Sequence, residues 1–150
     1  MAYTTIDDPT IYFNTKLYTG NGGTQSISGV GFQPDWVWIK NRSGTDVHAL
    51  YDSVRGANKN LRSDATSAEG SQSDGLTSFD SDGFSVGAAG SVNTSSNNFV
   101  SWNWLASNTT ASNTDGTITS TVSANTTSGF SIVKWTGNGS ATTLGHGPGS

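Results

Sequence analysis

The sequence predicts an all-β protein, an antiparallel β-sandwich of jelly-roll type. Short stretches of alternating apolar and polar residues recur along the chain, and turn residues separate them. No window carries a sustained helical stripe of apolar residues. The chain has 10% aromatic but only 32% hydrophobic residues. Because each aromatic ring buries a large area, such a sparse apolar set can still close a thin core.

The strands follow from this alternation in chain order. The expected strands cover residues 11–18, 35–41, 47–52, 76–79, 84–87, 98–105 and 117–122. Residues 20–23 are glycine-rich and form the turn after the first strand. Asp-Gly pairs at 74–75, 82–83 and 115–116 predict further tight turns, because this pair tolerates positive φ angles. The polar stretch 62–73 is expected to be a long exposed loop.

The strand at residues 35–41 has large side chains on both faces. Trp36 and Trp38 lie on one face, and Val37 and Ile39 lie on the other. We therefore expect this strand to be central in a two-layer structure.

A repeat sets the expected domain organisation. The segment YTGNG at 18–22 returns as WTGNG at 135–139, an offset of 117 residues (135 minus 18), and Phe13 falls on Phe130. Two unrelated turns are the alternative, but matches outside the turn keep the same register. A repeat this long is a whole domain rather than a solenoid unit. The chain is therefore expected to be the front end of a longer tandem-domain protein.

Four segments follow from this repeat. Residues 1–11 form an N-terminal arm, and residues 12–106 form the sandwich. Residues 107–128 form a connector rich in Ser, Thr and Asn, which either contributes a strand or wraps against a neighbouring subunit. Residues 129–150 begin a second copy of the domain.

Composition excludes several classes of function. A net charge of -4 with scattered basic residues argues against a nucleic-acid-binding surface. Cysteine is absent, so no disulfide or thiolate metal site forms in this chain, which fits a protein folded in a reducing cytosol or one that needs no redox chemistry. The first eight residues do not resemble a secretory signal, and no apolar run is long enough for a membrane helix. We expect neither nucleic-acid binding nor membrane insertion.

Tryptophan is the first candidate for a binding residue. Trp36, Trp38, Trp102 and Trp104 form two alternating pairs. An exposed aromatic face can stack on a sugar ring, which makes all four glycan-binding candidates. Interior packing is the alternative, since buried rings dominate a thin core.

Charged residues form a second group of candidates. Arg55 follows Asp52 by three residues and can pair with it, with an acid on another strand or with an adjacent subunit. Asp35 and Asp46 are expected at the surface. Asp80 and Asp82 lie in an Asp-x-Asp-Gly pattern that suggests Ca²⁺, whereas a hairpin turn whose carboxylates cap backbone amides is the alternative. An EF-hand is excluded, because its twelfth position would be Ser91 rather than Glu.

The sequence lacks the patterns of common catalytic sites. His48 and His146 fall in different copies of the repeat, and no Gly-x-Ser-x-Gly elbow is present. Glu69 is the sole glutamate and lies in a polar loop, which argues against the paired carboxylates of a glycosidase. We therefore expect no enzyme activity.

Five motifs in order resemble a domain found in structural proteins of marine tailed phages, especially cyanophages. They are TGNG at 19–22, GFQPDWVWIKNR at 31–42, YDSVRG at 51–56, FDSDGF at 79–84 and VSWNW at 100–104. The resemblance covers residues 17–106. It implies a concanavalin A-like (laminin-G-like, lectin-like) sandwich that occurs in tandem in virion proteins of tail-fibre or appendage type.

This resemblance implies a function as well as a fold. We expect a virion structural protein, the virion-proximal part of a fibre or appendage whose lectin-like domains attach to the host surface. The alternative is a capsid decoration or appendage protein without host binding. Expected partners are other virion proteins, further copies of the chain in a homo-oligomer (a trimer in a fibre) and a host cell-surface glycan. The protein would be assembled in the host cytoplasm. No cofactor is expected apart from the Ca²⁺ alternative.

Overall fold

The computed structural model describes residues 6–148. Residues 1–5 of the predicted arm and residues 149–150 of the predicted second copy lie outside the described residues. The described part of the arm contains a short 3-10 helix, η1 (Pro9–Ile11). This helix begins after Asp8, whose carboxylate accepts a hydrogen bond from the Thr10 backbone N–H at 2.9 Å.

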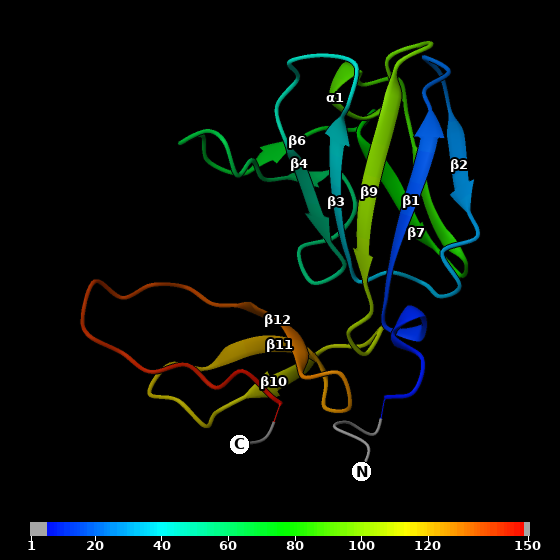
Figure 1. The fold of residues 1–150 in the computed structure, drawn as a ribbon. Helices are drawn as coiled ribbons and strands as arrows, with labels where there is room; N and C mark the ends of the chain where they lie inside the picture. Colours follow the sequence, from blue (N-terminus) through cyan, green and yellow to red (C-terminus); the bar gives the residue numbers. More distant parts are fainter. Residues whose placement is uncertain (1–5, 149–150) are drawn as a thin grey trace.

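One layer of the sandwich is a four-stranded antiparallel sheet, named sheet A here (Figure 1). Its strands, in spatial order, are β1 (Phe13–Thr19), β9 (Asn98–Trp104), β3 (Trp36–Asn41) and β4 (Ala49–Asp52). β3 lies between β9 and β4, which confirms the central position predicted for it.

The second layer is a three-stranded antiparallel sheet, sheet B. Its strands, in spatial order, are β2 (Gln25–Ser28), β8 (Gly83–Val86) and β7 (Leu76–Asp80). β7 and β8 are joined at the predicted Asp-Gly turn, where Gly83 has a φ of 149°. A side chain at Gly83 would collide with the Ile27 carbonyl oxygen on β2, so only glycine fits there. β2 was not predicted, because Ile27 is its only apolar residue.

The hydrophobic core fills the space between these two sheets. Sheet A contributes Val37, Ile39, Ala49, Tyr51 and Phe99, and sheet B contributes Ile27, Leu76, Phe84 and Val86. Tyr18 stacks on Phe99, with ring centroids 5.2 Å apart and an interplanar angle of 12°. The all-β antiparallel sandwich is confirmed, whereas the jelly-roll connectivity stays a prediction.

The four tryptophans of β3 and β9 lie on the outer face of sheet A, away from sheet B. Trp36 is paired in register with Trp104, and Trp38 is paired with Trp102, so all four share one face. Among residues 6–148, the core cluster contains no tryptophan. These four side chains are thus outside the core between the two sheets, and they are half-buried on the outer face. The alternation along β3 defines two faces but does not say which one is covered.

Asp35 is fully buried, and the prediction that it lies at the surface is wrong. Its carboxylate accepts hydrogen bonds from the Ser53 hydroxyl at 2.5 Å, the Ala106 N–H at 2.8 Å and the Asn108 N–H at 3.0 Å. These donors come from the segment after β4 and the segment after β9. Asp35 therefore fixes the path of the chain as it leaves the sandwich.

Two small elements complete the sandwich end. β5 (Lys59–Asn60) pairs with β6 (Gly70–Ser71), and most of the polar loop predicted at 62–73 connects them. A helical turn, α1 (Gly90–Asn93), precedes β9, and its last residue, Asn93, is fully buried.

A third sheet, sheet D, lies at the end of the sandwich where β9 ends and β1 begins (Figure 1). It consists of β10 (Ala111–Asn113), β11 (Ser120–Asn125) and β12 (Phe130–Lys134). The segment predicted as a connector thus contributes two strands, and the expected opening strand of the second copy pairs with one of them.

Sheet D contacts the sandwich through its last strand. The Phe130 ring lies 5.8 Å from Trp36 and 6.2 Å from Trp104, measured between ring centroids. The Lys134 ammonium donates to the Val54 carbonyl at 3.3 Å. The division into a sandwich, a connector and a second copy remains a prediction.

Candidate functional site

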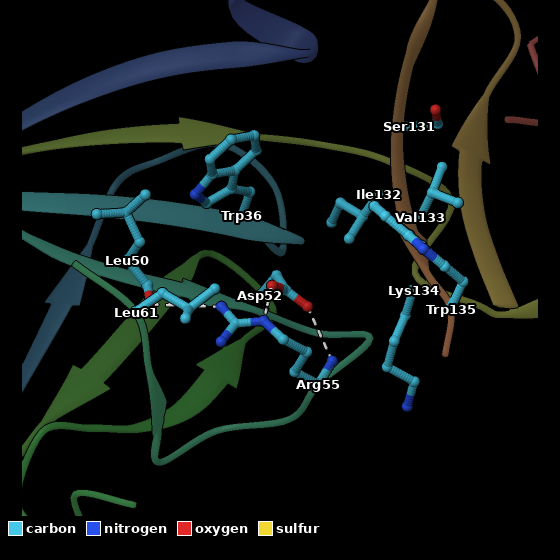
Figure 2. A pocket seen from close by; sticks show the side chains of 10 residues that line it. All are labelled: Trp36, Leu50, Asp52, Arg55, Leu61, Ser131, Ile132, Val133, Lys134 and Trp135. Carbon is cyan, nitrogen blue, oxygen red and sulfur yellow. Dashed lines mark hydrogen bonds and ion pairs between the residues drawn. The ribbon is translucent and has the colours of Figure 1, made fainter. Parts of the chain in front are cut away.

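The candidate site is an open cleft of about 380 Å³ between the edge of sheet A and strand β12 (Figure 2). The sandwich contributes one wall and β12 with the residue after it contributes the other. The lining residues are Trp36, Leu50, Asp52, Arg55, Leu61, Ser131, Ile132, Val133, Lys134 and Trp135.

The strands place these side chains by simple alternation. Trp36 is the first residue of β3, and Asp52, its partner in register, is the last residue of β4. Leu61 is held beside β4 by two backbone hydrogen bonds with Leu50, at 2.9 and 3.0 Å. On the opposite wall, the Ile132 side chain points toward Trp36 (Figure 2).

The cleft exposes apolar surface on both walls. Trp135 is 51% exposed and Leu61 is 36% exposed. Trp36 is half-buried, because the rings of Phe130 and Trp104 pack against it. The residues that line the cleft therefore include one tryptophan from each wall, Trp36 and Trp135. Flat apolar surface of this kind binds flat apolar groups, including the C–H face of a sugar ring.

An ion pair borders the apolar surface. Arg55 Nε lies 2.5 Å from Asp52 Oδ2, and the Asp52 carboxylate also accepts from the Arg55 backbone N–H at 2.8 Å. The guanidinium further donates to Glu69 at 3.1 Å and to the Lys59 carbonyl at 3.2 Å. Arg55 and Asp52 are thus largely committed to each other and to the loop around them. They present a rigid polar border rather than free charges.

Lys134 provides a more available cation. Its ammonium has three donors, and the one bond described for it is the long contact with the Val54 carbonyl. Its side chain is exposed at the cleft wall. A hydroxyl or carboxylate of a bound molecule could therefore accept a hydrogen bond there.

Trp36 is the only one of the four predicted tryptophans that lines this cleft. Trp38, Trp102 and Trp104 lie farther along or across the outer face of sheet A. Trp38 donates its indole N–H to His48 Nδ1 at 2.8 Å and packs edge-on against Trp102, with centroids 5.7 Å apart. The structure therefore joins Trp36 with the Asp52–Arg55 pair and separates it from two of the other candidates.

Asp80 and Asp82 lie at the β7–β8 hairpin, away from the cleft. Asp82 accepts from the Gly31 N–H at 2.7 Å and the Gly29 N–H at 2.9 Å, and these two bonds lower the pKa of its carboxyl. Asp80 accepts from Ser78 and Ser85, both at 2.7 Å. Each carboxylate thus caps its own part of the hairpin.

No third acidic or histidine ligand joins them. Within residues 6–148, no group of three or more His, Asp or Glu side chains is placed to hold a metal ion. The Ca²⁺ alternative therefore rests on the Asp-x-Asp-Gly pattern in the sequence, and the geometry of the hairpin adds nothing to it.

The sequence pattern does not predict the wall of the cleft that β12 forms. Trp135 is part of the repeated turn and is not among the predicted binding residues. Its exposure depends on where β12 packs, which alternation alone does not specify. A tryptophan at the end of a short strand among Ser, Thr and Gly was the available signal.

Asp52 is the one carboxylate among the lining residues, and it is bound to Arg55. Within the described chain, no helix has the length and apolar character needed to cross a bilayer.

The chain was compared with known proteins. No curated protein and no solved structure matches it. One family model matches residues 8–150, nearly the whole chain, and it is described as a domain of unknown function, DUF7483. The chain therefore belongs to the DUF7483 family.

Proposed function

We propose that this chain is a virion structural protein that attaches to a host-surface glycan through the cleft between sheet A and β12. The motifs that resemble phage structural proteins support the virion role. The cleft supports glycan binding, and one observation carries that part of the proposal: Trp36 from sheet A and Trp135, the residue after β12, both line the cleft beside a rigid polar border.

The cleft has the composition of a shallow sugar site. Carbohydrates present apolar C–H faces and a rim of hydroxyls, and they are matched by aromatic rings with nearby hydrogen-bonding groups. Trp135 contributes an aromatic side chain that is 51% exposed, and the neighbouring Lys134 contributes hydrogen-bond donors. A single open cleft of this size binds weakly. Attachment would gain strength from several copies on one particle through effective concentration.

Glycan binding is tested with the purified chain on an array of bacterial surface polysaccharides. Hits are then titrated by tryptophan fluorescence. Trp135→Ala is expected to weaken binding about two- to tenfold, which corresponds to the roughly 0.5–1.5 kcal/mol of one aromatic contact. Trp36→Ala should have a similar effect.

Trp102→Ala is the matched control, because Trp102 lies on the same sheet face but outside the cleft. Equal affinities for the Trp135 and Trp102 variants would refute the cleft as the site. Absence of any bound glycan would refute the attachment function.

A structural role without host binding is the second candidate. It is favoured by an exposed apolar stripe along β1, where Leu17 is 63% exposed and Phe13 is 37% exposed. Such a stripe suits a contact with another virion protein. Loss of particle incorporation by Leu17→Lys, with glycan binding absent in the parent chain, would select this role.

A further inference from the structure

The two glycine-asparagine-glycine loops of the repeat have the same local conformation. Gly22 has a φ of 71°, and its counterpart Gly139 has a φ of 75°. In the first loop, Asn21 Oδ1 accepts from the Gly23 N–H at 2.8 Å. In the second loop, Asn138 Oδ1 accepts from the Ser140 N–H at 3.0 Å. Both loops follow a strand at the edge of a sheet, β1 and β12.

The first loop is bound by one buried asparagine, Asn93. Its side-chain oxygen accepts from the Asn21 N–H at 2.9 Å. Its amide nitrogen donates to Asn21 Oδ1 at 2.9 Å and to the Gly23 carbonyl at 2.6 Å. The Asn93 backbone carbonyl also accepts from the Gly22 N–H at 2.9 Å. The loop thus presents a complete set of donors and acceptors for an asparagine.

Close backbone contact explains the first glycine of this loop. A side chain at Gly20 would collide with the Thr94 carbonyl oxygen, next to Asn93. The Gly20 N–H donates to the Asn97 carbonyl at 2.9 Å, and the Gly20 carbonyl accepts from the Ser96 N–H at 2.9 Å. The turn formed by residues 93–97 therefore sits directly on the loop.

The second loop has the same receptor chemistry, and among residues 6–148 no turn like that of residues 93–97 lies on it. Residues 134–143 are exposed. Of the described residues, none comes within 4 Å of a side chain built at Gly137 or Gly139. No described contact therefore requires glycine at position 137, although its counterpart in the first loop cannot carry a side chain.

We infer that the loop at residues 137–140 is a docking site for an asparagine-bearing turn of the kind formed by residues 93–97, contributed by a segment whose turn is not already bound to a loop of its own, as the turn of residues 93–97 is. The asparagine side chain would bond the Asn138 N–H, Asn138 Oδ1 and the Ser140 carbonyl. The turn backbone would lie against Gly137. The internal repeat identifies the occupant, because the first loop has the same conformation and is bound by an asparagine side chain and its turn.

The test appends a second copy of residues 87–106 to the full chain through a flexible Gly/Ser linker. The linker keeps the segment at an effective concentration on the order of millimolar. Amide hydrogen exchange is then measured at Gly137, Asn138 and Gly139. In the first loop, the equivalent amides are all bonded to the 93–97 turn. Docking is expected to slow their exchange about tenfold relative to the unextended chain.

Three variants separate docking from unspecific contact. Asn93→Ala in the appended copy should restore fast exchange. Gly137→Ala should do the same, because its methyl group would meet the docked backbone, although nothing opposes it in the free chain. Asn97→Ala in the appended copy should keep the protection, since that residue reaches the loop through its backbone carbonyl.

Fast exchange at all three amides in the extended chain would overturn the inference. Protection that survives the appended Asn93→Ala change would overturn it as well. Protection that fades on dilution would assign docking to separate chains, and protection independent of concentration would assign it to one chain.

Discussion

Replacing Asp35 should test how the end of the sandwich is held together. Asp35→Ala removes a fully buried carboxylate that accepts from Ser53, Ala106 and Asn108. The Ala106 N–H stays buried without a partner, since that residue is only 2% exposed. The Ser53 hydroxyl can turn elsewhere, and Asn108 is exposed enough to reach water.

The size of the effect follows from these partners. Hydrogen bonds to a charged group contribute about 1.5–3 kcal/mol each, and an orphaned buried donor costs about 1–3 kcal/mol. Allowing for water at Asn108, we expect Asp35→Ala to lower the free energy of unfolding by about 3–5 kcal/mol. Asp35→Asn keeps one acceptor oxygen for the two N–H donors. It should lower the free energy of unfolding by about 1–2 kcal/mol.

Urea unfolding followed by tryptophan fluorescence measures both variants. Phe130 stacks on Trp36 and Trp104, so the signal also reports detachment of sheet D. Asp115→Ala is the control, because Asp115 is exposed, and it should change stability by less than about 0.5 kcal/mol. An Asp35→Ala chain as stable as this control would refute the assignment of Asp35 as a structural anchor.

Three further predictions use other features of the fold. Gly20→Ala should destabilise the chain by about 1–3 kcal/mol, since the methyl group meets the Thr94 carbonyl, whereas Gly137→Ala should be neutral in the free chain; equal urea midpoints would contradict this. Burial raises the pKa of the Tyr18 hydroxyl, so its contribution to stability is present below the pKa of an unfolded tyrosine, about 10, and is lost as the pH rises above it. Tyr18→Phe should therefore flatten the alkaline side of a stability–pH curve, and an unchanged slope would argue against burial as the cause. Backbone N–H donors lower the pKa of Asp82, so its contribution is present above the unfolded carboxyl pKa of about 3.9 and is lost as the pH falls through the lower folded value. Thermal melts of Asp82→Asn between neutral and acidic pH should lose less stability than those of the parent chain, and an identical loss would rule out this linkage.

The sequence by itself determined the fold class and most of the strands. Alternation in β1, β3 and β9 is a local property, and it predicts extended structure with two faces. The Asp-Gly pair at 82–83 is also a local signal, because it reflects the backbone angles that a tight turn needs. The repeated loop at residues 137–140 keeps the conformation of the first for the same reason.

Only the tertiary structure decided which faces are covered and which distant residues meet. β3 and β9 carry large apolar side chains on both faces, so their pattern allows either face to be the interior. Sheet B covers the face with Val37 and Phe99, which leaves the tryptophans outside. The burial of Asp35 depends on where the segment after β9 packs, and the cleft that both Trp36 and Trp135 line depends on where β12 packs. The alternation of residues along a strand shows which side chains share a face. Which face is buried depends on how separate sheets pack, and that is a property of the tertiary structure.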